Sequence, residues 1–140
     1  MRTRSGTTIV EQLVILAVTG VLATIAFRSI GSALDSFAVH GATREVRDVF
    51  AAAREYAVAS GVRTAVQIEP LLARVSAFAG NDTVVVRPLA QLHQVALLSS
   101  RDSMAYSPSG LGYGAANLRV IITRRSAAET VNVSRLGRVR

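Results

Sequence analysis

The sequence has no cysteine among its 140 residues, no tryptophan and only 3 prolines. Without a thiol the chain can have no disulfide framework, no cysteine nucleophile and no cysteine-ligated zinc. Lysine is also absent, so all 16 basic residues are arginines against 9 acidic residues, and the formal net charge is +7. This charge favours an anionic partner such as nucleic acid or a membrane surface, although topology and solubility also account for an excess of this size.

Catalytic and metal-binding patterns are also missing from the sequence. His40 and His93 have no second ligand type at metal-binding spacing, and no serine lies in a nucleophile-elbow pattern. The sequence therefore predicts no enzyme, no metal and no cofactor. Half of the residues are hydrophobic, and the mean hydropathy is +0.36. A chain of this length forms one domain by the usual prior, and its hydropathy predicts that part of it lies in lipid.

A long apolar segment covers residues 7–27, directly after a leader, residues 1–6, that carries Arg2 and Arg4. As a helix these residues span about 32 Å, which matches the hydrocarbon core of a bilayer. The flanking arginines predict a cytoplasmic N-terminus, with the rest of the chain on the far side. A core helix of a soluble domain is the alternative. A cleaved secretory signal is not favoured, because no small-residue cleavage site precedes a polar turn.

Glu11 is a carboxylate near the start of this apolar segment. An ionised carboxylate is costly in lipid, so Glu11 either has a partner and a role or lies hydrated at the headgroup level. The leader ends at Gly6, and Glu11 is the fifth residue after it, followed by Gly20 within the apolar segment. This pattern resembles the class III signal of type IV pilins and type II secretion pseudopilins.

The resemblance implies cleavage by prepilin peptidase between Gly6 and Thr7, methylation of the new N-terminus at Thr7, and an assembly role for Glu11. In that role the carboxylate neutralises the N-terminus of a neighbouring subunit. Two positions depart from the family pattern: Thr7 stands where phenylalanine is usual, and Gln12 adds a polar group. Residues 28–48 contain no proline, which favours a minor subunit over a major one.

Apolar residues then continue at helical spacing, and Gly61 provides a stop, so the sequence predicts one helix from about residue 8 to residue 60. Residues 28–61 form the amphipathic continuation of this helix. Its predicted apolar face consists of Ile30, Leu34, Phe37, Val46, Val49, Phe50, Ala53, Tyr56 and Ala57.

Residues 62–140 are predicted to form a β-rich domain in which one antiparallel sheet packs on the helix, an α+β arrangement. Turn residues separate the strands, including a predicted turn at 126–129. The predicted strands cover residues 62–68, 72–78, 83–87, 95–98, 104–106, 118–123 and 130–133.

Residues 51–62, 107–110 and 133–139 resemble the GspH/FimT group of minor pseudopilins and minor pilins. The resemblance implies a pilin-like fold, a single-pass protein of the bacterial inner membrane, and a periplasmic C-terminal domain. It also implies partners: other pilin or pseudopilin subunits, prepilin peptidase, and secreted cargo or DNA. The predicted function is a structural subunit near the tip of a type II secretion pseudopilus or type IV pilus. A single-pass periplasmic anchor with no filament role is the alternative.

The C-terminal end is strongly basic, with six arginines and one glutamate from residue 119 to residue 140. A charged sheet edge that discourages aggregation accounts for this excess. The alternative is a DNA-backbone contact surface, formed by a turn and a flexible tail and typical of salt-sensitive, sequence-independent binding. The candidate DNA-binding residues are Arg124, Arg125, Arg135, Arg138 and Arg140.

Overall fold

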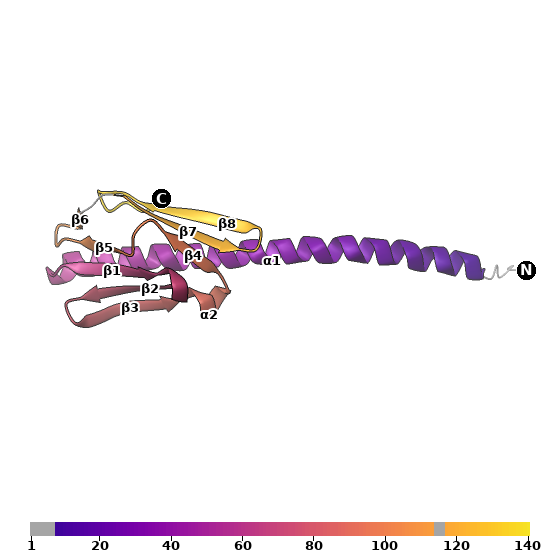
Figure 1. Ribbon diagram of the computed structural model, residues 1–140, viewed down its shortest axis with the longest axis horizontal. Helices are drawn as coiled ribbons and strands as arrows, with labels where there is room; N and C mark the ends of the chain where they lie inside the picture. Colours follow the sequence, from indigo (N-terminus) through magenta and orange to yellow (C-terminus); the bar gives the residue numbers. More distant parts are fainter. Residues whose placement is uncertain (1–7, 114–116) are drawn as a thin grey trace, which may run out of the picture. The chain divides into compact units, whose positions relative to one another are not determined.

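The computed structural model describes residues 8–113 and 117–140. Within these residues, one long helix is followed by eight strands and two short helical segments (Figure 1). The chain divides between Leu34 and Asp35 into two units. The first unit consists of the N-terminal part of the long helix, and the second contains the rest of that helix and all of the strands.

Helix α1 runs from Ile9 to Ser60 without interruption. The predicted helix over residues 8–60 is therefore confirmed, and so is its stop. Gly61 has a φ of 67°, in the left-handed region that glycine adopts without a steric penalty.

The first unit exposes an almost wholly apolar surface. Residues 9–30 of α1 are exposed throughout, and an 18-residue window of the helix has a mean hydropathy of 2.1. The hydroxyls of Thr19 and Thr24 donate to the carbonyl oxygens of Ile15 and Gly20, at 2.7 and 2.9 Å. These polar groups are therefore satisfied inside the helix, as a bilayer requires. By length and composition this stretch is able to cross a membrane.

The second unit contains two antiparallel sheets rather than the single sheet predicted (Figure 1). The five-stranded sheet has the order β3-β2-β1-β5-β6, and the three-stranded sheet has the order β4-β7-β8. The strands are β1 (Thr64–Glu69), β2 (Arg74–Ala79), β3 (Asp82–Pro88), β4 (Ala96–Ser99), β5 (Ser103–Tyr106), β6 (Gly112–Tyr113), β7 (Leu118–Arg124) and β8 (Ala127–Val133).

All seven predicted strands are present, and the α+β fold class is confirmed. Three short elements were not predicted: the 3-10 helix η1 (Pro70–Leu72), helix α2 (Leu89–His93) and strand β6. The predicted turn at 126–129 is wrong, because β8 begins at Ala127 and pairs with β7 from Arg124 onward. A tight turn at Arg125–Ser126 is enough to connect the two strands, since Arg125 adopts the left-handed conformation with a φ of 49°.

The core of the second unit lies between one face of α1 and the inner faces of both sheets. The predicted apolar face is correct from Val46 onward, except that Tyr56 is partly exposed. It is wrong before that point, because Ile30, Leu34 and Phe37 are exposed. The stripe that is buried instead consists of Asp35, Val39, Ala42, Thr43, Val46, Val49, Phe50, Ala53 and Ala57.

Tyr106 is buried in this core, and its hydroxyl has no hydrogen-bond partner among the described residues. Desolvation raises the pKa of Tyr106 to about 12, although the charge of Arg54 acts in the opposite direction. The unfolded chain loses this proton near pH 10, so stability should fall as the pH rises from about 10 to about 12. Tyr106→Phe should reduce this alkaline loss, measured as the thermal midpoint at pH 9 and pH 11. An unchanged alkaline loss would contradict the prediction.

Candidate functional site

The start of α1 holds Glu11, the residue predicted to act in assembly. Thr8 is the N-cap: its Oγ1 accepts a hydrogen bond from the backbone N–H of Glu11 at 3.3 Å. A threonine followed three residues later by glutamate is the capping-box pattern, a local signal in the sequence for this helix start that was not predicted. Glu11 therefore lies in the first turn, where the helix dipole favours a negative charge. Gly6 and Thr7 lie outside the described residues.

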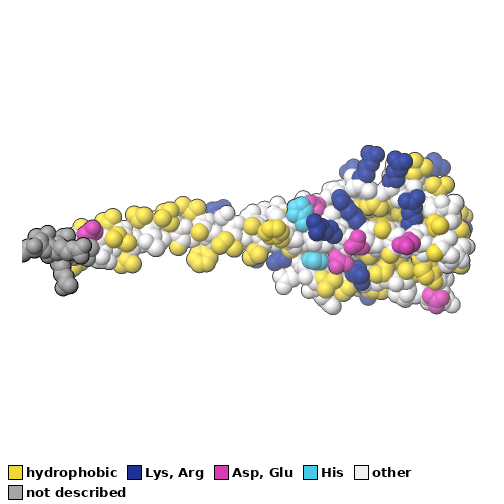
Figure 2. Space-filling model, turned by 180° about the vertical axis from the view of Figure 1, so that it is seen from behind, with side chains coloured by type: hydrophobic (Ala, Val, Ile, Leu, Met, Phe, Trp, Pro, Cys, Tyr) yellow, Lys and Arg dark blue, Asp and Glu magenta, His cyan; other side chains and the backbone are white. Residues whose placement is uncertain are grey.

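Glu11 is exposed among exposed apolar neighbours such as Val10, Leu13 and Val14. Its carboxylate forms no ion pair with residues 8–113 or 117–140. Hydrophobic side chains recur along the described part of the first unit, as the yellow atoms in Figure 2 show. This arrangement presents one charge at the start of an apolar stretch, residues 9–27 of α1, that is otherwise suited to lipid or to packing against other apolar helices.

The β7–β8 turn carries Arg124 and Arg125, two of the predicted DNA-binding residues. Arg124 donates to the carbonyl oxygen of His93 at 2.8 Å and to Oε1 of Gln94 at 3.2 Å. Its Nε lies 3.0 Å from Oδ1 of Asp35, whose side chain is only 5% exposed. Arg125 extends toward the same carboxylate, with 3.6 Å between Nη1 and Oδ2, but remains 76% exposed. The guanidinium of Arg124 is thus engaged inside the protein, whereas most of Arg125 faces solvent.

The C-terminal segment is not the flexible tail that the sequence predicted. Residue 140 exchanges two backbone hydrogen bonds with Asn132, at 2.8 and 2.9 Å, and Val139 pairs with Val133. Residues 134–138 form a turn, which is closed by a hydrogen bond from the N–H of Ser134 to the carbonyl oxygen of Arg138. The segment therefore folds back along β8 and fixes the backbone positions of its arginines.

Arg138 and Arg140 line a groove of about 690 Å³ on the three-stranded sheet. Arg119 of β7 also lines it and donates from Nε to Oδ1 of Asn132 at 3.3 Å. No acidic residue lines this groove among the described residues. Arg119 was not among the predicted site residues. The alternation of β7 between buried and exposed positions is the signal that places it on the outer face.

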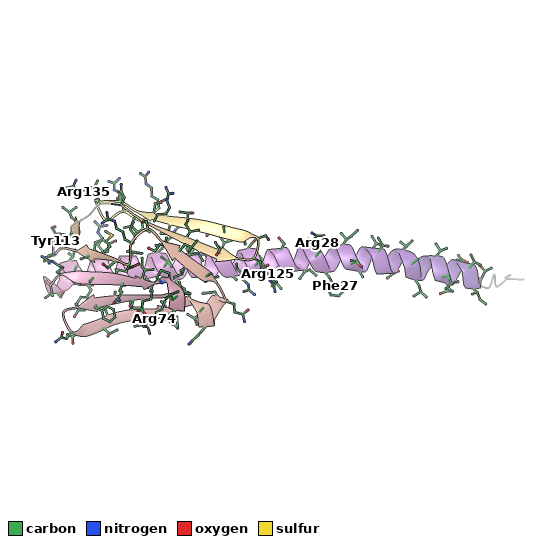
Figure 3. The ribbon with its side chains drawn as sticks, in the orientation of Figure 1. Phe27, Arg28, Arg74, Tyr113, Arg125 and Arg135 are labelled. Atoms are coloured by element: carbon green, nitrogen blue, oxygen red, sulfur yellow. The ribbon has the colours of Figure 1, made fainter. Side chains whose placement is uncertain are left out.

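The structure divides the five candidate arginines into two groups. Arg125 lies at one end of the second unit and Arg135 at the other, where its carbonyl oxygen lies close to Gly112 of β6 (Figure 3). Strand register gives the same division, because Arg124 pairs with Ala127 at one end of the hairpin and Leu118 pairs with Val133 at the other. Six residues of strand span about 20 Å. The groove brings together Arg119, Arg138 and Arg140, and its lining does not include Arg124, Arg125 or Arg135.

Comparison with solved structures identifies this architecture. The type IV minor pilin FimU of Pseudomonas aeruginosa matches with a TM-score of 0.62 at 12% identity, covering 73% of this chain and 86% of FimU. The fold is that of a minor pilin. A second crystal form of FimU gives a TM-score of 0.60. The minor pseudopilin EpsH of the Vibrio cholerae type 2 secretion system matches with a TM-score of 0.57 at 13% identity, covering 73% of this chain and 94% of EpsH.

No family model and no curated protein matches the chain. The similarity to FimU and EpsH confirms the expected pilin-like fold. A pilin-like fold together with one long apolar N-terminal helix fits a membrane-anchored protein. The residues assigned to cleavage, methylation, assembly and DNA contact stay predictions.

Proposed function

We propose that the chain is a minor pilin or minor pseudopilin, a structural subunit of a type IV pilus or type II secretion pseudopilus. The observation that carries this proposal is the exposed apolar stretch of α1 with Glu11 in its first turn, joined to a domain with the pilin fold. Such a stretch needs an apolar environment, first the inner membrane and then the packed helices of a filament. The role is structural rather than enzymatic.

In this proposal prepilin peptidase cuts between Gly6 and Thr7, the new N-terminus is methylated, and the subunit joins other subunits near the filament tip. The N-terminus then stays on the cytoplasmic side until assembly, and the β-rich domain lies in the periplasm, where it contacts sibling subunits or secreted cargo. The basic leader and the apolar helix support this orientation.

Intact mass tests the processing step. Protein from membranes that contain prepilin peptidase should have the mass of residues 7–140 plus one methyl group. Gly6→Ala should leave the chain uncut, and so should deletion of the peptidase. Ser5→Ala is the matched control, because it changes the neighbouring residue and should be cut normally. A chain that stays uncut beside an active peptidase would instead favour the single-pass anchor.

DNA binding is a second candidate function, favoured by the acid-free groove that contains Arg119, Arg138 and Arg140. Affinity of the full chain for a double-stranded DNA fragment should fall steeply with salt, since each phosphate contact releases counterions. Arg138→Ala should weaken binding to all sequences and reduce the slope of log K against log salt by about 1. Fluorescence anisotropy over a salt series measures both effects.

Arg74→Ala is the matched control, because Arg74 is bound to Glu69 and lies in the other sheet. It should leave the salt slope unchanged. Equal losses of DNA affinity in the two variants would indicate a general effect of charge rather than a site in the groove. This result would reject the DNA-binding function, and the proposed filament role would not be affected.

A further inference from the structure

Strand β8 forms an edge of the three-stranded sheet, and only part of this edge is covered. Arg140 exchanges two backbone hydrogen bonds with Asn132, and Val139 pairs with Val133. In an antiparallel ladder a residue directs its N–H and C=O to one neighbouring strand, and the direction alternates along the strand. The backbone groups of Asn132 therefore point away from β7. In the described part of the chain, no strand pairs with the preceding residues of β8 on that side.

Two residues of β8 direct their backbone groups to the uncovered part of this edge. Ala128 and Thr130 alternate in step with Asn132, so their N–H and C=O groups also point away from β7. Both residues are exposed. We call Ala128 and Thr130, with these outward backbone groups, the open edge. It offers two donors and two acceptors that no described strand uses.

The open edge lacks the features that keep the other sheet edges from pairing with a further strand. The β2–β3 pairing contains a register shift and β3 ends at Pro88, whereas β4 and β6 have only four and two residues. Strand β8 has seven residues, no proline and an unbroken register with β7. Its one charged residue, Glu129, faces the opposite side of the sheet from the side chains of the open edge. An edge of this kind accepts an added strand.

One face of α1 runs beside the open edge. Five residues of the helix recur at intervals of three and four and therefore share this face. We call them the basic stripe: His40, Arg44, Arg47, Ala51 and Arg54. At one end of the stripe, Nδ1 of His40 lies 2.5 Å from Oε1 of Glu129 in β8. At the other end, Ala51 and Arg54 line a groove of about 450 Å³ together with residues 137–140. The exposed Arg44 and Arg47 lie between these two contacts and so flank the open edge.

The charge beside the open edge is positive. The basic stripe contains three arginines and no acidic residue. Glu45, Asp48 and Glu55 each follow directly after one of these arginines, so they lie about 100° around the helix from the stripe. In β8, Glu129 is already paired with His40. An occupant that carries carboxylates is therefore favoured over a neutral or basic one.

A second copy of this chain does not fit the open edge. An antiparallel pair of open edges uses all of the outward backbone groups only if Ala128 lies opposite Thr130 of the copy. In that register Glu129 lies opposite the same residue of the copy, and like charges directly opposite each other destabilise a strand pair. The occupant is therefore a segment with another sequence.

We infer that the open edge binds an extended, acidic segment of another filament subunit, which adds a strand to the sheet beside the basic stripe. The choice of a filament subunit rests on the proposed function. The added strand continues the line of residues 138–140, with its backbone bonded to Ala128 and Thr130 and its carboxylates beside Arg44 and Arg47. Backbone pairing supplies the affinity, and the arginines select an acidic sequence.

Fluorescence anisotropy of the full chain in detergent tests the open edge, with a fluorescein-labelled peptide that alternates valine and glutamate. Thr130→Pro removes one outward N–H, and proline is tolerated there because this N–H is not bonded to β7. The variant should bind the peptide about tenfold more weakly. Thr130→Val is the matched control, because it keeps the N–H and should bind normally. Equal affinities of the two variants would show that the peptide does not use the edge, and the inference would be wrong.

Charge reversal tests the basic stripe and does not depend on the folding of the proline variant. Arg47→Glu should weaken binding of the valine–glutamate peptide about fivefold and strengthen binding of a valine–lysine peptide. Arg101→Glu is the matched control, because Arg101 is exposed in the connection between β4 and β5. It should leave both affinities unchanged. Equal effects of the two reversals would indicate a general effect of charge and would reject the stripe as part of the site.

Measurements in cells separate this inference from the proposed function. Thr130→Pro should still be cut after Gly6, but its incorporation into sheared filaments should be about tenfold lower than that of Thr130→Val, in line with the lost affinity. Normal cutting with equal incorporation would overturn the inference and leave the proposed function standing. An uncut parent chain would refute the proposed function, and with it the filament subunit as occupant. If the full chain dimerises and Thr130→Pro abolishes the dimer, a second copy occupies the edge and the inference is also overturned.

Discussion

Asp35→Ala is expected to lower the free energy of unfolding of the second unit by about 2–3 kcal/mol, because it leaves a partly buried guanidinium without its carboxylate. Asp35 is almost completely buried, and Arg124 lies 3.0 Å from its Oδ1. That oxygen accepts no hydrogen bond from a described residue, so its interaction with Arg124 is one of charge rather than of hydrogen-bond geometry. Urea unfolding of the full chain in detergent, followed by circular dichroism, measures the loss.

Asp48→Ala is the matched control for this variant. Asp48 lies on the same helix but is exposed, so its loss should change stability by no more than about 0.5 kcal/mol. The double variant Asp35→Ala, Arg124→Met should recover part of the loss, since both charges are then gone. Equal effects of the two aspartate variants would show that the buried pair contributes nothing.

Glu11→Gln is expected to reduce incorporation of the subunit into filaments on the order of tenfold to a hundredfold, about 1.4–2.8 kcal/mol, while leaving it in the membrane. The reason is that the proposed partner, the N-terminus of a neighbouring subunit, would be left without a counter-charge in an apolar surrounding. Glutamine preserves the volume, and it also serves in a capping box, so the start of α1 should be unaffected. Quantitative blotting of sheared filaments against membranes measures the ratio.

Gln12→Ala is the comparison variant, because it removes the neighbouring polar group without a change of charge. It should assemble normally. If Glu11→Gln assembles as well as Gln12→Ala does, the carboxylate has no assembly role. Its presence in the apolar segment is then explained by hydration at the headgroup level, in the first turn of the helix.

The long helix and seven of the strands were predictable from the sequence, whereas η1, α2 and β6 were not. The extent of α1 follows from an apolar run and a glycine stop, and the strands follow from β-branched residues between turn signals. Strand β6 has only two residues and α2 only five, too few to establish a period. The division into two sheets was also missed, because strand alternation reports which residues face inward and not which strands pair.

The candidate sites could likewise be predicted only where they depend on residues that are close together in the sequence. Glu11 could be identified because a single charge stands out in an apolar run. The buried Asp35 could not, since burial of a carboxylate depends on Arg124, which is far away in the sequence and adjacent only after folding. Arg138 and Arg140 were recognised as basic, but the groove they share with Arg119 depends on backbone pairing with β8 that composition cannot report.

The order in which strands enter the two sheets has a consequence for how the domain comes apart. The chain builds β1 to β3 in the larger sheet, crosses to the smaller one for β4, returns for β5 and β6, and crosses again for β7 and β8. Each sheet is thus interrupted in sequence by the other, and both share the core on α1. No single cut in the polypeptide yields two fragments that each hold one complete sheet. The two sheets therefore depend on the same core and on each other's chain segments, and they should lose their structure in a single cooperative step.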